Sequence, residues 1–165
     1  MLSPEVKEQI APVLGKVPSG VFILIAGDST GRKTGLLASW IQQASFDPPQ
    51  VTVAVNKSRY LNDWLQSGSA VTINQISKSD NRLFKHFGKG FDPDEDAFDS
   101  LQTSSGTNGL PLLTNALASM EGLVHSQMEA GDHVIYLVEI TAAVSHTDSP
   151  DVVPFVHIRK NGFNY

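Results

Sequence analysis

The sequence of 165 residues contains no cysteine. This absence excludes disulfides, thiolate nucleophiles, cysteine-ligated iron–sulfur clusters and dithiol redox relays. If the protein transfers electrons, a bound organic cofactor has to carry them. A long hydrophobic run is missing as well, because the apolar stretch at residues 21–26 has only the length of a strand. No membrane span is therefore expected.

The charged fraction is ordinary for a soluble protein, but no cluster of Lys and Arg stands out. Asp, Glu, Lys and Arg make up 18% of the residues, and the formal net charge is −5. Neither a nucleic acid nor an anionic membrane is therefore an expected partner. The first residues lack the basic-then-apolar pattern of a signal peptide, so the expected location is cytoplasmic.

The usual signatures of hydrolytic and metal chemistry are also absent. There is no Gly-x-Ser-x-Gly motif, and the five histidines show no ligand-pair spacing. Residues 27–35 nearly match the phosphate-binding P-loop motif, but Arg32 occupies the position of the required second glycine. A strand is expected to follow, whereas the motif needs a helix there. These residues are therefore predicted to form a hairpin loop, and no metal site is expected.

Hydrophobic periodicity predicts a β-rich chain with short helices. Strands are expected at residues 21–26, 51–55, 70–76, 120–129, 134–144 and 155–159, with a further extended run at 35–46. Helices are expected after Ser3-Pro4, over residues 60–67 with Ser58 as N-cap, and from Ser79 or Asp80 to about Phe87. Residues 89–108 have no clear period and are predicted to be a lid or a mobile cover. The pattern suggests a closed antiparallel barrel.

Residues 35–55 are the most informative stretch. The run 35–46 is small and polar where a buried strand would be bulky, and Asp47-Pro48-Pro49 then forms a stiff corner. The β-branched run 51–55 is expected to be a strand buried on both faces. A strand edged with small side chains lets a flat ligand lie against its backbone, whose N–H and C=O groups become the recognition surface.

Further motifs accompany this stretch in a fixed order. They are Val17-Pro18-Ser19-Gly20, Ile73-Asn74-Gln75-Ile76, Gly109-Leu110-Pro111-Leu112-Leu113, Gly131-Asp132-His133 and the tail at 156–165. Together they make nearly the whole chain resemble the flavin reductase-like family with an FMN-binding split barrel, and in particular the module at the C-terminal end of cyanobacterial flavodiiron proteins. The resemblance implies an all-β dominated fold with short helices, an antiparallel Greek-key split β-barrel, formed by residues 1–165 as one domain.

The resemblance also implies a function. It predicts an oxidoreductase that holds FMN, with FAD as the other possibility, and passes hydride from NADH or NADPH to free flavin or to a protein electron acceptor. The flavin N5 accepts the hydride, so no catalytic side chain is expected. A homodimer is implied too. Two alternatives stay open: an FMN-binding electron relay without its own NAD(P)H site, and a non-flavin barrel that acts as an interaction module.

The resemblance places the isoalloxazine ring against the backbone of residues 36–40 and 44–46. The cofactor-binding residues predicted in this region are Leu37, Ala38, Ser39, Trp40, Gln42, Gln43, Ala44 and Ser45. Where the family usually carries Asn in the first flavin-contacting strand, this chain has Ser39 followed by Trp40. The alternative interpretation of Trp40 is a core residue.

A phosphate site is predicted immediately after these strands. Asn56, Lys57, Ser58 and Arg59 supply two cations, a hydroxyl group and the start of a helix. The alternative is a plain helix cap whose cations face water.

His133 matches the Gly-Asp-His element of the family, and the resemblance implies that it contacts nicotinamide or a substrate flavin without acting as a proton donor. The alternative is a turn histidine bonded to Asp132. Arg159, Lys160 and Tyr165 in the tail are expected to reach the cofactor or a second subunit.

Overall fold

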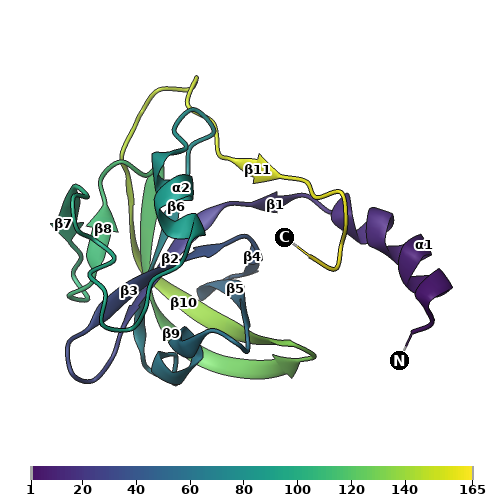
Figure 1. Cartoon of the computed structure of the whole chain (residues 1–165). Helices are drawn as coiled ribbons and strands as arrows, with labels where there is room; N and C mark the ends of the chain where they lie inside the picture. The colour runs from purple at the N-terminus through teal and green to yellow at the C-terminus, as the bar shows by residue number, and fades with distance from the viewer. Residues whose placement is uncertain (1, 165) are drawn as a thin grey trace.

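Strands dominate residues 2–164, the part of the chain that the computed structural model describes (Figure 1). The helices are α1 (Pro4–Gly15), the 3-10 helix η1 (Tyr60–Trp64) and α2 (Arg82–Gly88). The strands are β1 (Ser19–Gly20), β2 (Phe22–Gly27), β3 (Lys33–Ala38), β4 (Ile41–Phe46), β5 (Pro49–Asn56), β6 (Ala70–Gln75), β7 (Thr103–Ser105), β8 (Pro111–Leu113), β9 (Ala118–Ala130), β10 (His133–Ser145) and β11 (Val156–His157). Within these residues, no helix has the length and apolar character needed to cross a membrane.

Seven strands form one antiparallel sheet in the order β3-β2-β6-β9-β10-β5-β4. β3 and β4 are its two edges, yet only Ser39 and Trp40 separate them in the sequence. The Trp40 carbonyl accepts a hydrogen bond from the Ala54 N–H at 3.0 Å, which brings the end of β3 beside β5. The sheet therefore curls until its edges meet, and the predicted β-dominated antiparallel barrel is confirmed.

β2 lies between two hydrophobic cores. Because successive side chains of a strand point to opposite faces, Leu24 enters the barrel interior, whereas Ile23 and Ile25 enter a second core beneath α2. Phe87, which the sequence predicts to face inward, is 1% exposed and belongs to the second core. The second core therefore fastens α2 to the outside of the barrel, next to β3.

β5 is less buried than its sequence predicts. Val51, Val53 and Val55 are buried in the barrel, but Thr52 and Ala54 between them are only partly buried. The prediction of a strand buried on both faces is wrong because the second face of β5 borders the cavities described below.

The loop between β5 and η1 also differs from its prediction. Ser58 does not cap a helix, because its N–H and hydroxyl both donate to Asn56 Oδ1, at 2.9 and 2.7 Å. The expected helix over residues 60–67 is the shorter η1. Asn62 Nδ2 donates to the carbonyls of Asn56 at 2.8 Å and Arg59 at 2.7 Å, so side-chain bonds to the backbone fix this loop.

The segment at residues 89–108 packs over the second core. Ala97 is fully buried there, and Phe91, Phe98 and Leu101 pack against it. Its residues 103–105 form β7, which pairs with β8. The segment therefore covers the second core and is held there by hydrophobic contacts, whereas its mobility and its role as a lid stay predictions.

The C-terminal tail returns past β1 to α1 (Figure 1). β11 pairs with β1 and is shorter than the final strand predicted from the sequence. Beyond it, the Arg159 N–H donates to the Gly15 carbonyl at 2.9 Å, and the Gly162 N–H donates to the Ala11 carbonyl at 2.7 Å. A Cβ at Gly15 would lie 2.6 Å from the Arg159 carbonyl, so this close approach requires glycine. The tail is therefore anchored on α1.

Gly35→Ala is expected to lower the free energy of unfolding by about 1–3 kcal/mol, because a methyl group there would overlap the ring of Phe87. Gly88→Ala is the matched control, since a Cβ at Gly88 meets nothing within 4 Å. Urea titrations of both variants measure the difference. Equal midpoints for the two variants would contradict the close packing of β3 against α2.

Candidate functional site

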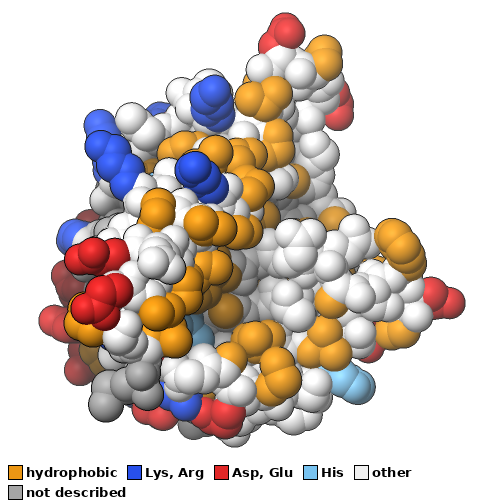
Figure 2. Space-filling model, turned by 90° about the vertical axis from the view of Figure 1, so that its right-hand side faces the viewer, with side chains coloured by type: hydrophobic (Ala, Val, Ile, Leu, Met, Phe, Trp, Pro, Cys, Tyr) orange, Lys and Arg blue, Asp and Glu red, His pale blue; other side chains and the backbone are white. Residues whose placement is uncertain are grey.

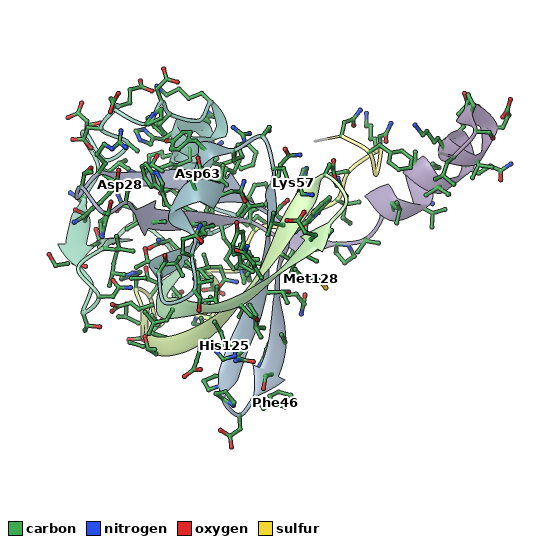
Figure 3. All side chains as sticks on the ribbon, turned by 90° about the horizontal axis from the view of Figure 1, so that it is seen from below. Asp28, Phe46, Lys57, Asp63, His125 and Met128 are labelled. Carbon is green, nitrogen blue, oxygen red and sulfur yellow. The ribbon has the colours of Figure 1, made fainter. Side chains whose placement is uncertain are left out.

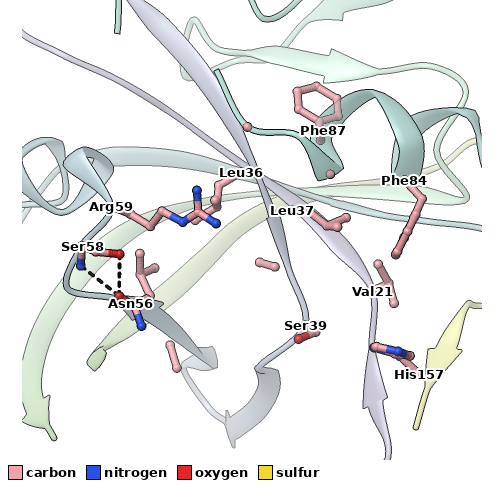
Figure 4. A pocket seen from close by; sticks show the side chains of 15 residues that line it. Val21, Leu36, Leu37, Ser39, Asn56, Ser58, Arg59, Phe84, Phe87 and His157 are labelled. Carbon is pink, nitrogen blue, oxygen red and sulfur yellow. Dashed lines mark hydrogen bonds between the residues drawn. The ribbon is translucent and has the colours of Figure 1, made fainter. Parts of the chain in front are cut away.

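A cavity of about 360 Å³ opens between β3, the end of β5 and α2 (Figure 4). We call it the inner cavity. Its lining is Val21, Leu36, Leu37, Ala38, Ser39, Ala54, Val55, Asn56, Ser58, Arg59, Phe84, Phe87, Gly88, Gly90 and His157. Most of these residues are apolar, and the volume lies in the range of small-molecule sites.

One wall of the inner cavity is β3. This strand is an edge of the sheet, so it hydrogen-bonds to β2 on one side only, and half of its backbone groups are not used by the sheet. Leu36 and Leu37 are partly buried, and the Ser39 hydroxyl has no hydrogen-bond partner among the described residues. The wall therefore combines an apolar surface with unused backbone donors and acceptors, as a flat heteroaromatic ring requires.

The other end of the inner cavity is cationic. Asn56, Ser58 and Arg59 lie together there, in the loop that Asn62 fixes (Figure 4). Within residues 2–164, the Arg59 guanidinium has no hydrogen-bond or ion-pair partner. An unpaired guanidinium at the end of an apolar cavity is suited to bind an anion such as a phosphate group.

A second compartment of about 370 Å³ continues beyond this cationic end. It shares Leu36, Ser58, Arg59 and Gly90 with the inner cavity. Its remaining lining is Thr34, Gly35, Tyr60, Leu61, Lys89, Phe91, Asp92 and Glu95. Arg59 therefore stands between two connected spaces.

A third space, the outer groove, lies across Ser39 and Ala54 from the inner cavity. Its volume is about 510 Å³, and its lining is Leu14, Val17, Pro18, Ser19, Ser39, Trp40, Ile41, Gln42, Thr52, Ala54, Ile135, Arg159 and Gly162. The Arg159 guanidinium lies 5.1 Å from the centre of the Trp40 ring. The crossing from β3 to β4 thus separates two spaces of different character.

His133 is enclosed behind Trp40. The two ring centres are 4.7 Å apart, and His133 is only 6% exposed. Its Nδ1 lies 2.8 Å from Asp132 Oδ1, and this hydrogen bond lowers the pKa of the Asp132 carboxyl group below its usual value. His133 Nε2 is buried and has no hydrogen-bond partner among the described residues. The histidine does not line the inner cavity.

The structure gathers about half of the predicted cofactor-binding residues in one place. The inner cavity is lined by Leu37, Ala38, Ser39, Asn56, Ser58 and Arg59. Trp40 and Gln42 line the outer groove instead, and Lys57 forms an ion pair with Glu129. Gln43, Ala44 and Ser45 line none of the three spaces, because they lie on β4 in the hairpin whose far end carries Phe46 (Figure 3).

Several residues of the inner cavity were not predicted from the sequence. Phe87, Gly88 and Gly90 reach it because α2 packs beside β3. His157 reaches it because β11 pairs with β1, where His157 faces Ser19. These placements depend on contacts between distant segments, and no local pattern signals them. Of the tail residues predicted to reach a cofactor or partner, Arg159 lines the outer groove, and Tyr165 lies outside the described residues.

Known proteins resemble this chain in both sequence and structure. The family described as Flavin reductase like domain matches residues 14–163. Diflavin flavoprotein A 1 of Synechocystis sp. is 37% identical over 153 residues, which are 92% of this chain and 26% of that protein. The chain therefore spans about a quarter of the length of this relative.

Solved structures extend the comparison. The NADH:FAD oxidoreductase SgcE6 of Streptomyces globisporus C-1027 is similar with a TM-score of 0.82 and 26% identity, covering 96% of this chain and 92% of that chain. The structure of SgcE6 in complex with NAD and FAD fragments gives a TM-score of 0.78 at 26% identity, with the same coverage. These likenesses confirm the predicted split-barrel fold.

The His133–Asp132 hydrogen bond leads to a prediction about pH. Because the bond lowers the folded-state pKa of Asp132 below 3.8, its stabilising contribution is present above that pH and is lost as pH falls through the lowered pKa. His133→Phe removes the donor and should raise the pKa of Asp132 toward 3.8, as measured by NMR titration. Asp80, whose pKa is lowered by Arg82 instead, is the internal control. An unchanged Asp132 titration would contradict the assignment.

Proposed function

We propose that this chain, which belongs to the flavin reductase-like family as its motifs predicted, binds FMN in the inner cavity. With FMN bound, it passes hydride from NADH or NADPH to free flavin or to a protein electron acceptor. The observation that supports this most directly is the apolar cavity along the open edge of β3, which ends at the unpaired Arg59. Its shape and charge suit a flat ring with an anionic tail.

The residues of the inner cavity fit the flavin group. Leu36, Leu37 and Ala38 would pack against the ring system and exclude water from it, and the unused backbone groups of β3 would bond to its polar edge. Arg59 would hold the phosphate, with the turn of Asn56 and Ser58 beside it. When bound, the flavin supplies the atom that accepts hydride, so the chain needs to supply only position and shielding.

FMN is the first choice because one phosphate group matches one unpaired guanidinium. FAD is the alternative, since the second compartment continues past Arg59 and offers room for further groups. SgcE6 is named an NADH:FAD oxidoreductase, which keeps both flavins open for testing.

A second candidate function is an electron relay that holds FMN without its own NAD(P)H site. The position of His133 favours it, because the residue predicted to contact nicotinamide is 6% exposed beneath Trp40 and does not line the inner cavity. In this case a partner would reduce the flavin. The chain covers only a quarter of the diflavin flavoprotein relative, so such a partner would be another part of a longer protein or a separate protein.

We further propose that residues 1–165 act as one domain and that the chain forms a homodimer. Figure 2, which faces the side from which α1 projects, shows apolar side chains spread over that surface. Leu14 and Val17 at the outer groove are 42% and 59% exposed, and Ile158 and Phe163 of the tail are 61% and 50% exposed. A second copy covering this face would remove these side chains from water.

Arg59→Gln is expected to weaken FMN binding about ten- to hundredfold, because a charge-assisted bond to the phosphate is lost. Riboflavin, which has no phosphate, should bind the variant and the unmodified protein equally well. Lys57→Gln is the matched control, because Lys57 is paired with Glu129 and does not line the inner cavity. Quenching of flavin fluorescence measures all affinities. If Lys57→Gln weakens FMN binding as much as Arg59→Gln, the phosphate position is wrong.

The reaction itself is tested with the FMN-loaded protein under anaerobic conditions. Addition of NADH or NADPH should abolish the visible absorbance of the oxidised flavin, and added free flavin should then be reduced in turn. Flavin loading without reduction by either nucleotide would select the electron relay. If the folded protein has no affinity for flavin, the remaining alternative is a non-flavin barrel that acts as an interaction module.

A further inference from the structure

His157 lies in the inner cavity but has no role in the function proposed above. It belongs to β11, where it pairs with Ser19 of β1, and its side chain lines the cavity (Figure 4). Its neighbour Val156 is 55% exposed and points to the opposite face. The alternation of the strand therefore directs the imidazole into the inner cavity.

The backbone around His157 is fixed on both sides. Before it, the Phe155 N–H donates to the Ile76 carbonyl at 2.9 Å, and the Phe155 carbonyl accepts from the Val21 N–H at 3.1 Å. After it, the Arg159 N–H bonds to Gly15 of α1. The position of the imidazole is therefore set by three separate parts of the fold rather than by a free tail.

The imidazole is unpaired as well as fixed. It lies 6.4 Å from the ring of Phe155, and no hydrogen bond joins it to any described residue. In Figure 4 it lies next to Val21, across the cavity from Asn56, Ser58 and Arg59. A polar group that is held in an apolar cavity without a partner is available to a ligand.

The distribution of polar side chains indicates what part of the ligand His157 would meet. With Asn56, Ser58 and Arg59 grouped at the phosphate end, Ser39 and His157 are the polar side chains that remain in the lining of the inner cavity. An isoalloxazine ring carries carbonyl and ring-nitrogen groups along one edge, and these lose hydrogen bonds to water when the ring is buried. An imidazole nitrogen can donate to or accept from such a group.

We propose that His157 is a flavin-binding residue that contacts the polar edge of the isoalloxazine ring, at the end of the cavity opposite Arg59. This inference rests on the proposed function. It makes the C-terminal tail part of the cofactor site, so that α1 and β1 act as positioning elements for a group that touches the flavin. It also gives the flavin one orientation, with the phosphate at Arg59 and the polar ring edge toward β11.

The test compares His157→Leu with His125→Leu, whose histidine is exposed on β9 and lines none of the three spaces. Because His157 meets the ring and not the phosphate, His157→Leu should weaken FMN and riboflavin binding by the same factor, about three- to tenfold. The visible spectrum of the bound flavin should shift as well. His157→Gln, which keeps a polar group, should recover part of the affinity, and His125→Leu should bind as the unmodified protein does.

The outcomes separate this inference from the proposed function. If the unmodified protein binds neither FMN nor riboflavin, the proposed function fails. If it binds both, and His157→Leu and His157→Gln bind them with unchanged affinity and spectrum, the inference about His157 is overturned. A selective loss of FMN over riboflavin would also overturn it, because that result would place His157 at the phosphate.

Discussion

The crossing from β3 to β4 at Ser39 and Trp40 is the constraint on which the rest of the structure depends. β3 and β4 are the edges of one sheet, and the chain passes directly from one edge to the other. The bond from the Ala54 N–H to the Trp40 carbonyl closes the barrel at this point without pairing the whole length of β3. The edge of β3 along the inner cavity therefore keeps unpaired backbone groups. These groups can form hydrogen bonds to a ligand.

The same crossing divides the surroundings of β5 into two environments. On one side, the inner cavity is lined mostly by apolar residues and has Arg59 at one end. On the other side, Trp40 contacts both His133 and Arg159 and lines the outer groove. Trp40 thus covers His133, and it does not line the inner cavity. This explains why the structure supports flavin binding more directly than it supports a nicotinamide site.

Much of the fold could be predicted because it is encoded locally. Alternation of apolar residues marks β9 and β10, and Gly131-Asp132 marks the turn between them. The loop at residues 56–59 was predicted to bind phosphate from its composition and its place after β5. Local patterns predict which face of a strand is buried, but they do not predict which distant segment packs against that face.

The differences between the predicted site and the lining of the inner cavity have this origin. Lys57 and Arg59 look equivalent in the sequence, and only the folded chain brings Glu129 to Lys57 and leaves Arg59 unpaired. His157 is separated from β1 by most of the chain, so its pairing with Ser19 has no local signal. Asn62 fixes the loop at residues 56–59 by donating to two of its backbone carbonyls, and no helical pattern indicates these bonds.

We propose that FMN lies along the open edge of β3 with its phosphate at Arg59. A crystal structure of the protein with FMN shows whether it does. We expect electron density for the ring against Leu36–Ser39 and for the phosphate beside the Arg59 guanidinium. Density for FMN in the outer groove, against Trp40 and Arg159, with the inner cavity filled by the protein's own side chains, would contradict it.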